Sequence, residues 1–182
     1  AACVLAPDPT FVMYRIYAMQ AHVRYASVPL HADFTLDVDA LVAEIARQKP
    51  ALVWLASPNN PTGRAIPAAA IERVLAAAPG LVVVDEAYAD FAGTTLVPRV
   101  LEFPNLVVMR TLSKVGLAGA RLGYAVGHPA WIGEFDKVRS PYNVNALTQA
   151  VVPVVLGAAD AMAAQVAAIR AERGRLAAAL GA

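Results

Sequence analysis

Short apolar segments alternate with helical patterns along most of this chain, and this alternation limits the folds that it can adopt. We expect strands at residues 3–6, 22–28, 51–56, 81–84, 106–110 and 121–126. We expect helices at residues 10–20, from residue 37 or 39 to 48, at 67–78 and 129–138, and two alanine-rich helices after residue 146. Such alternation with short loops predicts an α/β fold, in which a mostly parallel sheet lies between two helical layers.

Local signals set the expected boundaries of three helices. Thr10 is expected to cap the first helix, and Asp37 or Asp39 to open the second, because short polar side chains accept hydrogen bonds from the free N–H groups of a first turn. Pro67 stands where a first-turn proline is favoured.

Composition excludes several classes of protein. The 182 residues suffice for one domain with a sizeable core. A net charge of +1 without a Lys/Arg cluster argues against nucleic acid as the main partner. Residues 146–169 are apolar but interrupted, and never reach the roughly 20 unbroken apolar residues of a membrane span. We interpret that stretch as one or two buried helices. The only cysteine, Cys3, cannot form an intrachain disulfide, which fits a cytoplasmic protein.

Polar residues follow three of the expected strands. Asn60 lies in the segment after residues 51–56, and Asp85 and Tyr88 follow residues 81–84. Lys114 and Arg121 come after residues 106–110. In open α/β sheets the carboxyl ends of parallel strands meet at one edge, where ligands bind. The sequence therefore predicts that these five side chains share one site.

The residue types at this edge suit an aldehyde cofactor that carries a phosphate. The amine of Lys114 can bond covalently to an aldehyde. The hydroxyl of Ser113 and the guanidinium of Arg121 can hold a phosphate dianion, the latter through two parallel hydrogen bonds.

Some of the polar residues, and Phe11, also have an alternative interpretation without a ligand. Asp85 could be a helix N-cap, and the sequence from Asn60 to Gly63 is a plausible turn. Phe11 could be a core residue of its helix, and Glu86 is expected to serve local structure rather than catalysis. The three histidines lack the spacing of metal ligands, so we expect no metal site.

Four segments together resemble the fold-type I pyridoxal-phosphate aminotransferases: SPNNPTG at 57–63, VVDEAY at 83–88, RTLSK at 110–114 and GLAGARLGY at 116–124. Within that group the chain most resembles the histidinol-phosphate aminotransferases, through APDPTFVMY at 6–14 and PYNVN at 141–145. The resemblance implies that residues 1–182 form the cofactor-binding large domain, as a fragment of a longer protein. Residues 158–182 would be a helix that leads toward a small C-terminal domain.

The resemblance also implies a role for each residue. Lys114 would bind pyridoxal 5'-phosphate covalently and act as the base that moves the substrate α-proton, and Asp85 would face the pyridine nitrogen. Asn60 and Tyr88 would donate hydrogen bonds to the phenolic oxygen of the cofactor, with Lys114, Asp85 and Tyr88 as the catalytic set. The remaining cofactor-binding residues would be Phe11, stacked on the ring, and Thr111, Ser113 and Arg121 around the phosphate. Only one residue, Val115, separates Lys114 from the glycine-rich run, where many relatives have two.

The implied activity is transamination of L-histidinol phosphate with 2-oxoglutarate, giving imidazole acetol phosphate and glutamate, in histidine biosynthesis. The implied protein is a homodimer that acts on small molecules, and this segment alone would be weakly active or inactive. Three alternatives remain: an aminotransferase for aromatic or other amino acids, a phosphoserine- or phosphothreonine-type decarboxylase, and a cofactor-sensing domain of a transcription regulator.

Overall fold

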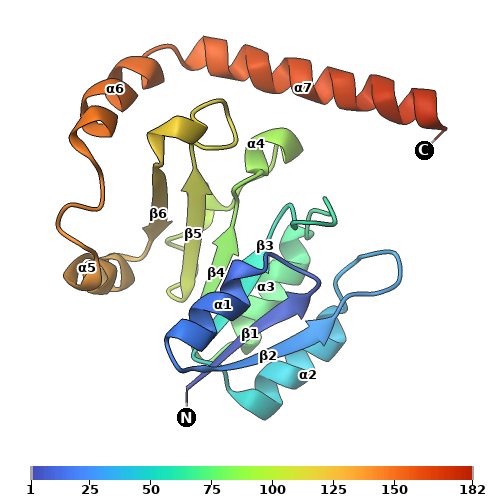
Figure 1. Cartoon of the computed structure of the whole chain (residues 1–182). Coiled ribbons are helices and arrows are strands. Elements are labelled where there is room, and N and C mark those ends of the chain that lie inside the picture. Colours follow the sequence, from blue (N-terminus) through green and yellow to red (C-terminus); the bar gives the residue numbers. More distant parts are fainter. Residues whose placement is uncertain (1, 182) are drawn as a thin grey trace.

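The computed structural model describes residues 2–181, which form one six-stranded sheet with helices against it (Figure 1). The sheet order is β2-β1-β3-β4-β5-β6. The first five strands are parallel, and β6 is antiparallel to β5. The strands are β1 (Cys3–Asp8), β2 (Arg24–Pro29), β3 (Leu52–Ala56), β4 (Leu81–Asp85), β5 (Leu106–Thr111) and β6 (Gly123–Gly127).

Helices connect the strands and then continue beyond the sheet. They are α1 (Met13–Gln20), α2 (Val38–Gln48), α3 (Ala68–Ala77), α4 (Ala89–Ala92), α5 (Pro129–Val138), α6 (Ala146–Leu156) and α7 (Ala159–Leu180). The sequence did not predict the short α4, nor the two 3-10 turns at Val97–Arg99 and Ala118–Ala120. The predicted fold class, a mostly parallel sheet in an α/β chain, is confirmed.

The two faces of the sheet are covered by different helices. On one face, Ile45 of α2 and Val74 of α3 pack with strand residues such as Val53 in the largest buried cluster. Burial of each such side chain stabilises the fold by roughly 1.5–3 kcal/mol. On the other face, Tyr14 of α1 packs near Ala6 and Ala56, and Trp131 of α5 lies against a smaller cluster around Val83. This packing fixes the sheet whose carboxyl edge carries the polar residues.

The expected Thr10 cap is wrong. Helix α1 begins at Met13, its N-cap position is Val12, and no side chain caps it. The Thr10 hydroxyl instead donates a hydrogen bond to Oδ1 of Asn59, at 2.7 Å. Here a contact between distant segments has replaced a local cap, and it ties the start of α1 to the loop after β3. In α2, by contrast, Asp37 is the N-cap, and its carboxylate accepts a hydrogen bond from the amide of Ala40. Of the two residues expected to open this helix, Asp37 and Asp39, the first does so.

Two strands begin two residues later than expected because a residue with left-handed backbone stands at each expected start. His22, with φ of 55°, lies just after α1, and β2 begins at Arg24. Arg121, with φ of 51°, ends a 3-10 turn, and β6 begins at Gly123. A positive φ is incompatible with an extended strand. Neither His22 nor Arg121 can therefore belong to a strand, and each strand begins after that residue.

The expectation of buried helices after residue 146 is also wrong. No residue of α7 is buried, and in α6 only Thr148 and Val152 are. Figure 1 shows why: α7 lies beyond the strand ends near α4, rather than on a face of the sheet, and those faces are covered by other helices. Within residues 2–181 no single helix is long and apolar enough to cross a membrane; α6 and α7, bent by 81° between them, meet those two criteria only as a pair.

Candidate active site

The carboxyl edge of the sheet brings the ends of β3, β4 and β5 side by side. Ala56 pairs in register with Asp85, and Asp85 pairs with Met109 on its other side. Asp85 therefore ends a central strand whose preceding residues, Val82 to Val84, are buried. Its backbone carbonyl accepts a hydrogen bond from the amide of Ser57 at 2.9 Å, which starts the loop after β3 beside it.

A buried amide organises that loop. Asn59 is only 8% exposed, and its Nδ2 donates to the carbonyl of Pro9 and to the hydroxyl of Thr62, both at 3.0 Å. With the bond from Thr10 to its Oδ1, the Asn59 side chain joins the loop to the segment that precedes α1. A buried amide with every group paired holds its surroundings in one arrangement. The neighbouring Asn60 and the nearby Phe11 are thus carried on segments that are fastened to each other.

These segments enclose a small pocket of about 70 Å³ at the sheet edge. Five of the eight predicted site residues line it: Phe11, Asn60, Asp85, Tyr88 and Lys114. The rest of its lining consists of Tyr14, Ala56, Pro58 and Ala87. Residues from four separate parts of the sequence therefore meet in one place, as parallel strand ends require.

The carboxylate of Asp85 is held from two sides. Its Oδ1 accepts a hydrogen bond from the backbone amide of Ala87 at 3.0 Å, and its Oδ2 accepts one from the Tyr14 hydroxyl at 2.7 Å. Helix α4 begins only at Ala89, after Tyr88 in the N-cap position, so Asp85 does not cap it. The alternative interpretation of Asp85 as a helix cap is therefore wrong.

Sequence reasoning missed Tyr14 as a member of the site. It is 2% exposed, and its ring stacks on Trp54 with centroids 4.5 Å apart and planes 4° apart. Burial and the neighbouring carboxylate of Asp85 raise the pKa of the Tyr14 phenol far above its ordinary value. The available signal was its spacing, because Phe11 and Tyr14, three positions apart, lie on the same side of the helix expected at residues 10–20.

Lys114 lines the same pocket as this buried group. Its Nζ is 5.3 Å from the centroid of the Tyr88 ring, a cation–π distance. The Lys114 side chain is exposed, and the ion pairs found among residues 2–181 do not include it. Its amine is therefore accessible to a small molecule in the pocket.

The other three predicted residues do not line this pocket. The Thr111 hydroxyl donates to the carbonyl of Leu122 and accepts from the amide of Ser113, both at 3.1 Å, so it holds its own loop together. Arg121 is exposed, and its Nη1 donates to the carbonyl of Ala118 at 3.4 Å. The phosphate-binding role of Thr111, Ser113 and Arg121 stays a prediction.

Glu86, next to Asp85, points into a different environment. It is 3% exposed and accepts hydrogen bonds from the Thr95 hydroxyl at 2.5 Å and the Leu96 amide at 2.6 Å. Arg110 lies 3.9 Å from Glu86 and 2.8 Å from Asp90. These contacts fix the chain that follows β4, in agreement with the structural role expected for Glu86.

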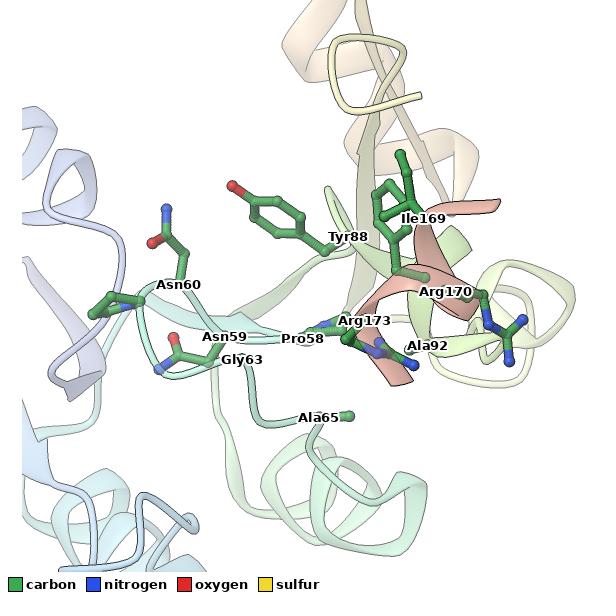
Figure 2. A pocket seen from close by; sticks show the side chains of 12 residues that line it. Pro58, Asn59, Asn60, Gly63, Ala65, Tyr88, Ala92, Ile169, Arg170 and Arg173 are labelled. Carbon is green, nitrogen blue, oxygen red and sulfur yellow. The ribbon is translucent and has the colours of Figure 1, made fainter. Parts of the chain in front are cut away.

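A larger, open pocket of about 590 Å³ adjoins the small one, and Asn60, Tyr88 and Pro58 line both. Its other walls come from the rest of the loop after β3, from α4 and from Arg170, Arg173 and Ile169 of α7. Figure 2 shows the Asn60 amide and the Tyr88 hydroxyl on one side of this pocket, with both guanidinium groups pointing away from them. A small molecule in the small pocket could therefore extend past Asn60 and Tyr88 into this larger space.

Comparison with known proteins gives a consistent result over the whole chain. Residues 2–182 match the family model of aminotransferase class I and II. A histidinol-phosphate aminotransferase 1 of Burkholderia lata is 58% identical over 177 residues, which cover 97% of this chain and 50% of that protein. The chain thus spans about half the length of the curated relatives it matches.

Solved structures share the fold. Histidinol-phosphate aminotransferase from Sinorhizobium meliloti, in complex with pyridoxal-5'-phosphate, superposes with a TM-score of 0.84 at 32% identity, covering 100% of this chain and 51% of that one. N-succinyldiaminopimelate aminotransferase from Mycobacterium tuberculosis superposes with a TM-score of 0.82 at 28% identity, covering 100% and 51%.

Proposed function

The chain belongs to the class I and II aminotransferase family, and we propose that its protein transfers the amino group of L-histidinol phosphate to 2-oxoglutarate. The products are imidazole acetol phosphate and glutamate, and the reaction is a step of histidine biosynthesis. The 58% identity to a histidinol-phosphate aminotransferase supports this substrate. The observation that carries the catalytic part of the proposal is the pocket shared by Lys114, Asp85, Asn60, Tyr88 and Phe11.

The side chains of that pocket fit pyridoxal 5'-phosphate. They offer an amine for an aldehyde, a carboxylate for a ring nitrogen, two hydrogen-bonding groups for a phenolic oxygen and an aromatic ring for stacking. When bound, this cofactor supplies an electron sink that makes the α-proton of an amino compound acidic. We propose that Lys114 holds the cofactor, that Asp85 faces its ring nitrogen, and that Asn60 and Tyr88 bind its phenolic oxygen.

Lys114 has a second task in this proposal, which is to carry the α-proton. Its amine is accessible and lies beside the ring of Tyr88, where a flexible four-carbon side chain can move between neighbouring atoms. Phe11 lines the pocket, and its ring forms an edge-type contact with the Tyr14 ring, with centroids 5.5 Å apart. An aromatic wall keeps water from its side of the pocket and favours one orientation of a flat ring.

We further propose that Ser113, Thr111 and Arg121 bind the cofactor phosphate, that the protein is a homodimer, and that it works in the cytoplasm. The loop from Thr111 to Arg121 carries the donors that suit a phosphate. Since the chain spans about half of its relatives, we expect these 182 residues alone to be weakly active or inactive.

A second candidate is an aminotransferase for another amino compound. The same fold occurs in a protein named N-succinyldiaminopimelate aminotransferase, so the fold itself does not select the substrate. Comparing turnover of histidinol phosphate with that of phenylalanine would separate the two. We expect a strong preference for histidinol phosphate, and a preference for phenylalanine would replace our substrate assignment.

The cofactor assignment is tested first by covalent labelling. The longest form of the protein is incubated with pyridoxal phosphate, reduced with borohydride, digested and mapped by mass spectrometry. We expect the label on Lys114, whose amine faces the pocket with Asp85. A protein that takes up no label, or takes it on another lysine, would overturn the assignment.

A further inference from the structure

A single buried hydroxyl lies behind the proposed ring-binding carboxylate. Tyr14 is 2% exposed, and within residues 2–181 its hydroxyl has one hydrogen-bond partner, Oδ2 of Asp85 at 2.7 Å. The bond joins residues that are 71 positions apart in sequence. A buried hydroxyl needs a partner, and this one is aimed at the carboxylate that lines the pocket.

We infer that Tyr14 is a positioning residue that orients the carboxylate of Asp85 toward the cofactor ring nitrogen and keeps it in place. The inference rests on the proposed function, because it assigns Asp85 to that nitrogen. Tyr14 touches Asp85 and acts on the cofactor through it.

The Tyr14 ring is itself immobilised. It stacks on Trp54, and it meets the Phe11 ring in an edge-type contact with planes 81° apart. A phenol in contact with two aromatic rings cannot swing away without losing both contacts, so its oxygen stays at one point. With the Ala87 amide on Oδ1, this oxygen completes a two-point hold that fixes the plane of the Asp85 carboxylate.

A phenol suits this task better than a charged donor would. A lysine or arginine at this position would pair with Asp85 and neutralise the charge that a protonated ring nitrogen needs. Burial raises the pKa of the Tyr14 phenol, so it stays a neutral donor. The hydrogen bond thus orients the carboxylate and leaves its full negative charge for the ligand.

The test is a double-mutant cycle on cofactor affinity. Tyr14→Phe removes only the hydroxyl. Asp85→Asn removes the negative charge of the carboxylate to which that hydroxyl donates. The dissociation constant of pyridoxal phosphate is measured for the longest form of the protein, both single variants and the double variant. Tyr17→Phe is the matched control, because Tyr17 lies on the same helix and is 51% exposed.

We expect Tyr14→Phe to weaken cofactor binding about tenfold, the size of a lost hydrogen bond to a charged group. In the Asp85→Asn background the same change should have less than about a twofold effect, since non-additivity marks two groups that act together. p-Aminophenylalanine at position 14 keeps a neutral donor on the ring and should restore affinity. Tyr17→Phe should bind as the unaltered protein does.

Several outcomes would overturn the inference. An equal effect of Tyr14→Phe in both backgrounds, or none in either, would show that the hydroxyl does not act through Asp85. A Tyr14→Phe protein that does not fold would assign the hydroxyl to stability. If Tyr14→Phe changes nothing while Lys114 still takes the label, the proposed function stands and only this inference fails. An unaltered protein without affinity for the cofactor would overturn both.

Discussion

The two ends of the proposed cofactor site differ in how the chain holds them. At the ring end, Asp85 follows a buried central strand, and its carboxylate accepts hydrogen bonds from Tyr14 and Ala87. At the phosphate end, the loop from Thr111 to Arg121 lies at the antiparallel edge of the sheet, and Arg121 is exposed. The ring-end carboxylate is held in part by a contact from a distant segment, whereas the phosphate-end residues bond mostly to their own loop.

The two ends are expected to contribute differently to the affinity for the cofactor. A preorganised carboxylate binds without ordering its side chain, so little entropy is lost on binding. An exposed arginine must give up its side-chain freedom to hold a phosphate in a fixed geometry, which offsets part of the gain. We therefore expect substitutions at the ring end to have larger effects than those at the phosphate end.

The largest effect is expected for Lys114→Ala, which removes both the proposed covalent attachment and the proposed base. Loss of a positioned base alone costs about 10²–10⁴-fold in rate, so we expect transamination to fall by at least about a thousandfold. Steady-state assays with histidinol phosphate and 2-oxoglutarate would measure it. Lys137→Ala is the matched control, since Lys137 is an exposed lysine paired with Glu134. A variant that keeps a tenth of the activity would contradict the role of Lys114.

The second-largest effect is expected for Asp85→Asn, which keeps the shape of the side chain and removes its charge. We expect the rate to fall about a hundredfold, because the carboxylate no longer pairs with the ring nitrogen. Affinity for pyridoxal, which lacks the phosphate, should fall as much as affinity for pyridoxal phosphate. Equilibrium dialysis with both compounds would show this. Unequal losses would mean that Asp85 does not act at the ring.

The sequence predicted the sheet because each strand carried its own signal. The buried runs at Val82–Val84 and Leu106–Val108 could be neither surface loops nor exposed strands, and the polar residues after them had to share one edge. Asp85, Asn60 and Lys114 were found in this way.

What the sequence could not predict depends on contacts between distant segments. Thr10 looked like a helix cap, but its hydroxyl bonds to Asn59, 49 positions away. Tyr14 is a buried core residue, but its hydroxyl also reaches Asp85, 71 positions away. The alanine-rich helices looked buried because composition reports apolarity, not whether another surface covers a helix. No local pattern carries that information.

A smaller effect is expected at the phosphate end. Arg121→Ala should weaken binding of pyridoxal phosphate about tenfold, the value of one charge-assisted contact to an oxyanion. Binding of pyridoxal should be unchanged, because it has no phosphate to lose. Arg64→Ala, another exposed arginine, is the control. If Arg121→Ala weakens the binding of both compounds equally, Arg121 does not bind the phosphate. The contrast between the two ends of the site would then be lost.

The smallest effect should appear in the alkaline stability of the fold. Burial raises the pKa of Tyr14 above its ordinary value of 10.0, so the unfolded chain loses this proton at lower pH than the folded chain. Above about pH 10 the unfolded state then binds fewer protons than the folded state, so the free energy of unfolding falls as pH rises. The contribution of the Tyr14 proton to the free energy of unfolding is fully present at lower pH, and about 1.4 kcal/mol of it is lost by roughly pH 11. Denaturant unfolding at roughly pH 9 and pH 11 would measure the loss.

The two ends of the site supply the comparison for this measurement. Tyr14→Phe, at the ring end, should remove that part of the alkaline loss, because phenylalanine has no proton to release. Tyr124→Phe, beside the phosphate end, is the control, because it removes a hydroxyl from a residue that is 45% exposed and takes no part in the buried contact. If both variants behave alike, the Tyr14 hydroxyl is not held in the buried contact with Asp85. The ring end would then be no better organised than the phosphate loop.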